Sequence, residues 1–176
     1  MRRRHLLICL GLVAVIVAGL RGVSRLWRQQ QVTAIALAGV PELPELTRWP
    51  PELKKELTAA GGAVVNSPAP VKSLARLATL YCANGFTTEG EQVLAALRQL
   101  EPRNARWPYL LADLQAHAGK DAAPALRHTL ELDPTYAPAW LRLGEWRLDH
   151  RDDDGARQDF QRAAALAPGN LRASYG

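Results

Sequence analysis

The chain has 176 residues, a formal net charge of +5 and two cysteines. Six of its 22 lysine and arginine residues lie within residues 1–28, which contain no acidic residue, so the rest of the chain has 16 basic against 17 acidic side chains and a net charge of −1. A nucleic-acid-binding domain is expected to carry a basic patch on its folded part. This balance therefore predicts no nucleic-acid partner.

The start of the chain predicts a membrane anchor. Arginines precede residues 6–20, an apolar run without a charge. The run is slightly short for a spanning helix, which needs about 20 residues, but Arg21 can reach the interface and lengthen the span. We expect residues 1–28 to form an uncleaved signal anchor that crosses the membrane with residues 6–23. The alternative is a cleaved signal that releases an exported soluble protein.

The orientation of this anchor depends on a nearly even charge distribution. Arginines lie on both sides of the apolar run, so the positive-inside rule favours neither side strongly. We expect the N-terminus to be cytoplasmic, as in other early basic signals. The protein would then be a single-pass protein of a bacterial inner membrane, with its folded part in the periplasm.

Residues 29–70 are expected to connect the anchor to the folded part. Residues 29–39 predict a juxtamembrane helix, which must end before Pro41 because a residue that precedes proline disfavours helix. Residues 41–51 contain four prolines and predict an extended, semi-rigid spacer.

A short helix is predicted at residues 51–60, with Pro51 in its first turn and Gly61–Gly62 as its end. Leu53 and Leu57 are four residues apart and form one apolar face. We expect this face to cover the flank of the domain that follows.

A similar series of residues then occurs three times. Each copy ends in a proline, which lacks the N–H that a continuing helix needs, and Pro102, Pro134 and Pro168 are 32 and 34 residues apart. The second copy is two residues short between Gln115 and Ala122, which predicts a shortened turn between its two helices.

Small and large residues recur at fixed places in each copy. The small residues predict close approach of the two helices of a hairpin, and the large ones are expected to pack beside the next hairpin. No single hairpin can bury this surface alone. The small positions are Ala78, Ala112 and Gly144 and also Gly90, Ala122 and Ala156; the large positions are Leu94, Leu126 and Phe160.

This pattern resembles the tetratricopeptide repeat (TPR) family, whose period is about 34 residues. The resemblance covers residues 71–170 and implies an all-α solenoid of helical hairpins. The sequence departs from the family pattern where the tyrosine position, Tyr81 in the first copy, holds Gln115 and Arg147 in the others. The implied units are residues 71–104, 105–136 and 137–170, followed by a tail at residues 171–176.

The resemblance also implies a partner-binding groove lined by the first helix of each hairpin. The lysine and asparagine residues with which some members hold a peptide carboxylate are absent from these positions. Acidic and apolar residues are present instead, which favours an apolar partner segment that carries basic residues. The alternative is that Leu141 and Leu148 merely pack against a missing neighbouring repeat. The predicted groove residues are Lys72, Thr79, Arg106, Tyr109, Asp113, His117, Leu141, Glu145, Leu148 and Asp149.

No catalytic, cofactor-binding or metal-binding motif is found. The histidines have no partners at metal-ligand spacing, and the segment from His150 to Gly155 resembles a calcium loop without its final glutamate. An enzyme would require residues such as Cys82, His117 and Asp113 to converge. The sequence therefore predicts a non-enzymatic membrane adaptor for a protein or peptide, or alternatively an accessory subunit of a membrane enzyme or secretion complex.

The last repeat is followed by few residues, whereas terminal repeats usually carry a polar cap. Three explanations remain open: a truncated chain, self-association through the open end, or a partner that supplies the cap.

Overall fold

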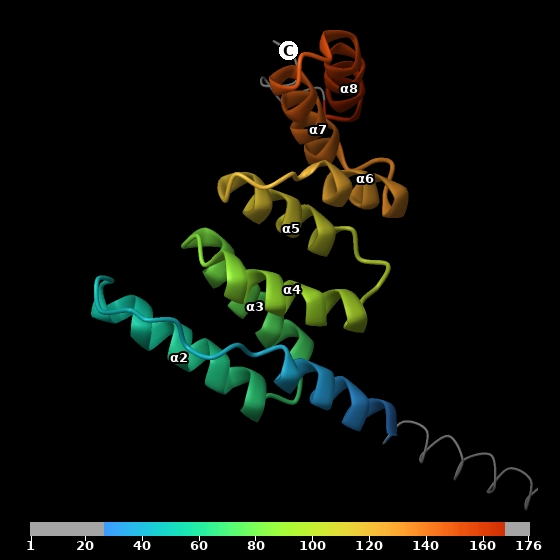
Figure 1. The fold of residues 1–176 in the computed structure, drawn as a ribbon. Coiled ribbons are helices and arrows are strands. Elements are labelled where there is room, and N and C mark those ends of the chain that lie inside the picture. Colours follow the sequence, from blue (N-terminus) through green and yellow to red (C-terminus); the bar gives the residue numbers. More distant parts are fainter. Residues whose placement is uncertain (1–26, 168–176) are drawn as a thin grey trace, which may run out of the picture.

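The computed structural model describes residues 27–167, and every regular element within that range is a helix. A helix at residues 27–38 is followed by seven more, stacked in chain order (Figure 1). None of these helices combines the length and apolar character that a membrane crossing requires. The predicted span at residues 6–23 and the predicted tail at residues 171–176 lie outside the described range. The seven helices are α2 (Pro51–Asn66), α3 (Pro70–Ala83), α4 (Thr87–Leu100), α5 (Arg106–His117), α6 (Ala123–Leu132), α7 (Ala137–Asp149) and α8 (Asp153–Leu166).

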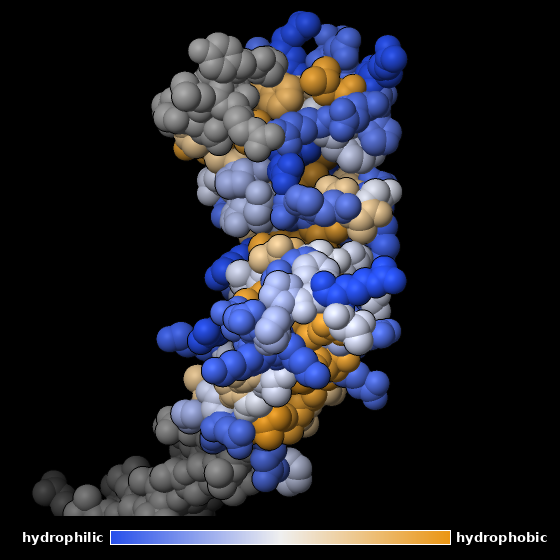
Figure 2. Space-filling view, turned by 90° about the vertical axis from the view of Figure 1, so that its left-hand side faces the viewer, coloured by the Kyte–Doolittle hydropathy of each residue, from blue (hydrophilic) through white to orange (hydrophobic). Residues whose placement is uncertain are grey.

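The last six helices form three antiparallel hairpins. α3 packs on α4, α5 on α6 and α7 on α8, and the second helix of each hairpin also contacts the first helix of the next. On the face drawn in Figure 2, hydrophobic surface is visible between rows of hydrophilic side chains. The arrangement confirms the predicted TPR-like hairpins.

The same backbone turn ends the first helix of every hairpin. A residue with positive φ occupies it: Gly85 at 72°, Gly119 at 70° and Arg151 at 64°. Left-handed residues of this kind commonly end helices and allow the following N–H to bond back to the helix. The recurrence shows the repeat at the level of the backbone. The bonds are Phe86 N–H to Tyr81 (3.0 Å), Lys120 N–H to Gln115 (2.9 Å) and Asp152 N–H to Arg147 (2.9 Å).

The second hairpin is shortened in its second helix. α6 has 10 residues, whereas α4 and α8 each have 14. The connection before α6 spans residues 118–122 and is longer than the other two turns, so the prediction of a shortened turn is wrong. Pro124 explains the difference, because proline is tolerated in the first turn of a helix but not further inside.

Glycine brings two pairs of helices close together. A Cβ atom on Gly144 would lie 2.7 Å from the Phe160 ring, so α7 and α8 approach at this point as the sequence predicted. A Cβ atom on Gly90 would lie 2.7 Å from Leu114 Cδ2, in the following hairpin. Gly90 therefore serves the contact between hairpins, and Phe160 packs against α7 within its own hairpin.

An ion pair joins α7 to α8 where the first repeat has Tyr81. Arg147 Nε lies 3.2 Å from Asp159 Oδ2 and 3.7 Å from Asp152 Oδ2, and the Asp159 side chain is only 5% exposed. Burial raises the pKa of Asp159 and the charge of Asp152 adds to this, whereas Arg147 opposes it. Arg147, which stands where the family pattern has tyrosine, thus has an ion-pair partner, Asp159, in the facing helix.

The segment before α2 packs against the first hairpin, an attachment that the predicted extended, semi-rigid spacer did not include. Ala36 and Leu46 are buried in the core formed with the first hairpin. The Trp49 ring lies 5.0 Å from the Phe86 ring, and Gln92 Nε2 donates a 3.3 Å hydrogen bond to the Ala38 carbonyl. The segment is held because its apolar side chains find partners in α4 and in the turn before it.

α2 is longer than predicted. It continues through Gly61 and Gly62 to Asn66 instead of ending at residue 60. Ala60 and Val64 are buried together with the predicted apolar pair Leu53 and Leu57, and this face packs on α3. Burial of the additional turn outweighs the low helix propensity of the two glycines.

Replacement of Gly62 by alanine is expected to raise the free energy of unfolding by about 0.5–1 kcal/mol, because glycine inside a helix loses more backbone entropy than alanine. A Cβ atom there would meet nothing within 4 Å. Urea unfolding measures the change. Gly39→Ala is the control and should destabilise, since its Cβ atom would overlap with that of Ala96.

Candidate partner-binding groove

A pocket of about 120 Å³ lies between the second and third hairpins. Its walls come from α5, from the start of α6 and from α7, which are the elements that the stacking of hairpins brings together. Most of the wall is apolar, with carboxylates and one arginine among the polar groups. The lining residues are Ala112, Asp113, Ala116, Ala122, Leu126, Arg142, Glu145, Trp146 and Asp149.

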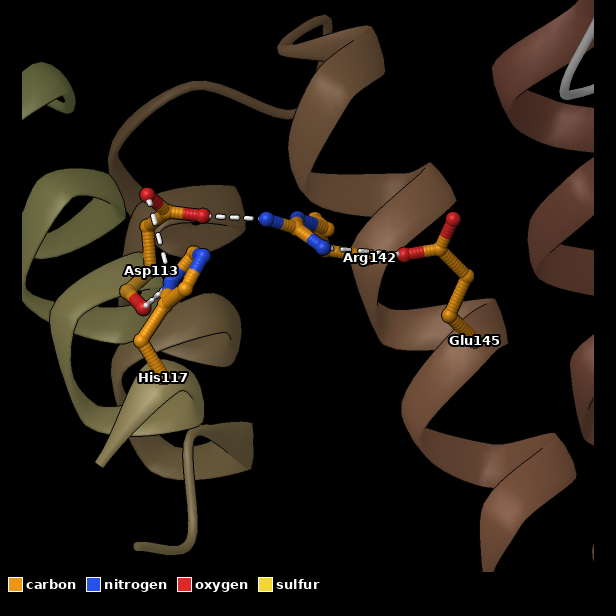
Figure 3. Close-up of polar contacts among 4 residues, drawn as sticks. All are labelled: Asp113, His117, Arg142 and Glu145. Carbon is orange, nitrogen blue, oxygen red and sulfur yellow. Dashed lines mark hydrogen bonds and ion pairs between the residues drawn. The ribbon is translucent and has the colours of Figure 1, made fainter. Parts of the chain in front are cut away.

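Arg142 links the two first helices across this pocket (Figure 3). Its guanidinium donates to an Asp113 carboxylate oxygen of α5 and, at 3.3 Å, to Glu145 Oε2 one turn along α7. Burial lowers the pKa of Arg142, but the hydrogen bonds and charges of Asp113 and Glu145 outweigh burial and raise it overall. The arginine is therefore permanently charged and has two carboxylate partners.

His117 lies on the other side of Asp113. Its Nδ1 atom is 2.7 Å from the Asp113 carbonyl oxygen and 3.8 Å from carboxylate Oδ2. Figure 3 shows His117 and Arg142 on either side of this carboxylate. The Asp113 carboxylate is thus held by Arg142 of α7 and lies close to His117 of its own helix.

The lining of the pocket has a surplus of negative charge. Three carboxylates, from Asp113, Glu145 and Asp149, face one guanidinium, which leaves a formal charge of −2 among the lining residues. Asp149 is exposed, and within residues 27–167 it forms no ion pair. An anionic ligand would meet repulsion here, and a cationic ligand would meet attraction.

Three predicted groove residues, Asp113, Glu145 and Asp149, come together at this pocket. His117 lies beside it, and Leu148 is 50% exposed on α7. These positions share one region because successive first helices lie side by side.

Other predicted residues lie elsewhere. Leu141 is only 6% exposed and packs with Ala156 and Phe160 of α8, so it belongs to the core and is removed from the groove surface. Lys72 and Thr79 are exposed on α3 and do not line the pocket.

Two predicted residues contact aromatic rings. The Tyr109 ring lies 5.0 Å from the Tyr136 ring, and the Arg106 guanidinium lies 5.4 Å from the centre of the Trp107 ring. Neither lines the pocket.

Sequence reasoning missed Arg142 and Trp146. The only local signal for Arg142 was Glu145, three residues later on the same helix face. Its contact with Asp113 joins residues 29 apart in the sequence, so it could be found only once the hairpins were stacked.

The described residues offer little for catalysis. Burial, with a contribution from the negative charge of Asp113, raises the pKa of the Cys82 thiol to about 11. The thiolate is the nucleophilic form of cysteine, so Cys82 is protonated and inert near neutral pH. Within residues 27–167, no group of three or more possible ligand side chains is arranged to hold a metal ion.

Comparison with solved structures places the fold among TPR proteins. A crystal structure of MamA is similar at 22% identity and a TM-score of 0.60, over 70% of this chain and 73% of that one. MamA from Desulfovibrio magneticus is similar at 18% identity and a TM-score of 0.58, over 69% and 70%. The first TPR of Spaghetti (RPAP3), bound to an HSP90 peptide, is similar at 22% identity and a TM-score of 0.55, over 59% and 84%. The sequence matches no protein-family profile and no curated protein.

Proposed function

We propose that this protein is a non-catalytic adaptor that binds a protein or peptide partner in the groove between α5 and α7. The observation that carries the proposal is the pocket at the junction of two hairpins, where charged side chains from successive first helices meet on a mostly apolar wall. Tandem hairpins create extended binding surfaces of this kind.

The RPAP3 structure supports the choice of a peptide ligand, since that TPR holds the peptide SRMEEVD. This peptide carries three acidic residues and one arginine. The pocket described above has the opposite preference, because its lining residues carry a surplus of carboxylates. We therefore propose a partner of different charge for this protein.

We further propose that the adaptor is anchored to a membrane by residues 6–23, with the repeats on the periplasmic side. The support is the uncharged apolar run at residues 6–20 with arginines on both sides. A reporter fused at Gly176 tests the orientation, and extraction of membranes at alkaline pH tests the anchor. Release of the intact protein at alkaline pH would rule out the anchor.

A site-specific crosslink tests the groove. A photoreactive amino acid at Ala116, which is exposed and lines the pocket, is expected to give a discrete protein adduct in cells. The matched control is Gln158, which is exposed on α8 away from the pocket. Adducts of equal yield at both positions, or none at Ala116, would contradict the proposal.

A further inference from the structure

We infer that the pocket accepts a lysine or arginine side chain of the partner, and that Arg142 is a built-in competitor for this position. The inference rests on the proposed function and deepens it, because it names the chemistry that the groove recognises. It also assigns to Arg142 the role of weakening, rather than providing, partner binding.

The size and walls of the pocket fit one long side chain. Its volume of about 120 Å³ is well below the roughly 300–1,000 Å³ of small-molecule sites. Ala112, Ala116, Leu126 and the Trp146 indole provide apolar surface. Lysine and arginine lay their aliphatic stems along such surfaces while the charged end stays near polar groups.

The charges at the pocket favour a positively charged group at the end of that side chain. Glu145 and Asp149 are one turn apart on α7, and Asp113 faces them from α5. The only cation among the lining residues, Arg142, already donates to two carboxylates, so it has little to offer an acidic ligand. A basic group would be attracted by the remaining negative charge.

Arg142 shows how a cationic side chain can be held in this pocket. Its guanidinium bridges carboxylates from two hairpins, and its side chain is 31% exposed. A basic side chain from the partner must share these carboxylates with Arg142 or displace it. Removal of Arg142 would change the formal charge of these lining residues from −2 to −3 and would remove a cation that competes with the partner's basic group.

The test begins with a displayed library of random 12-residue peptides selected on the full-length protein. We expect enrichment of lysine and arginine and depletion of aspartate and glutamate. A selected peptide is then measured by fluorescence anisotropy on two variants. Asp149→Asn should weaken binding about two- to fivefold and Arg142→Met should strengthen it by a similar factor, both effects shrinking at high salt.

Glu56→Gln is the matched control, since Glu56 is exposed on α2 and the change also removes one carboxylate; it should leave affinity unchanged. Thermal unfolding checks the fold of Arg142→Met, and if that variant is unfolded, Asp149→Asn alone decides. Absence of basic enrichment, or equal affinity for Asp149→Asn and wild type, overturns the inference.

The outcomes also separate the inference from the proposed function. Peptides without basic enrichment that still compete with the Ala116 crosslink would overturn the charge preference and leave the adaptor role standing. If no peptide is selected and no adduct depends on Ala116, both fail.

Discussion

Replacement of Arg147 by alanine is expected to lower the free energy of unfolding by about 3–5 kcal/mol, because it leaves the buried Asp159 carboxylate without its ion-pair partner. The Asp159 side chain is 5% exposed, and Arg147 Nε is 3.2 Å from its Oδ2 atom. In a stack of repeats each hairpin contacts only its neighbours. The loss should therefore appear first as unfolding of α7 and α8, measured by hydrogen exchange together with urea unfolding.

The double variant Arg147→Met with Asp159→Leu is the control, because replacing both partners by apolar residues is often neutral. Its stability should lie well above that of Arg147→Ala. Measuring the free energy of unfolding over a series of pH values gives a second check, on the effect of burying Asp159. Burial raises the pKa of Asp159 above the ordinary value of 3.8, so the folded state binds a proton more tightly than the unfolded state, and stability attributable to this group increases as the pH falls towards 3.8. Equal losses in the single and double variants would contradict this account.

Replacement of Gly144 by valine is expected to destabilise the protein by about 1–3 kcal/mol through overpacking. The new Cβ atom would lie 2.7 and 2.8 Å from two atoms of the Phe160 ring, so α7 and α8 would have to separate. Urea unfolding monitored by circular dichroism measures the effect.

Gly62→Val is the matched control, since a Cβ atom at Gly62 meets nothing within 4 Å. It should lower the free energy of unfolding by much less than Gly144→Val does. Similar costs at both positions would show that close packing at Gly144 does not limit the approach of the two helices.

The repeats were predictable because their determinants are local. A proline follows each of the first two hairpins, and a positive-φ residue ends the first helix of all three described hairpins. The N-terminal segment was not predictable in the same way. Leu46 and Trp49 look like parts of a spacer until Phe86, far along the sequence, is placed beside Trp49. Likewise, Gly61–Gly62 indicates a helix end until Val64 is seen to be buried beyond them.

The lining of the pocket between α5 and α7 was predicted in part for the same reason. Asp113, Glu145 and Asp149 face one pocket because they occupy related positions on first helices. Leu141 was assigned to the groove by its repeat position, but it turns inward to pack with Phe160. Arg142 was missed because its main partner belongs to another hairpin.

The seating of residues 36–49 on the first hairpin has a mechanical consequence. Because Ala36 and Leu46 are anchored in the core, the chain enters the repeat stack in a fixed direction, and the height of the α5–α7 groove above residue 27 is set by packing. Shortening residues 41–45 would not lower the groove, as trimming a loose tether would. It would instead remove Leu46 from the core and destabilise the packing at the N-terminal end of the repeat stack.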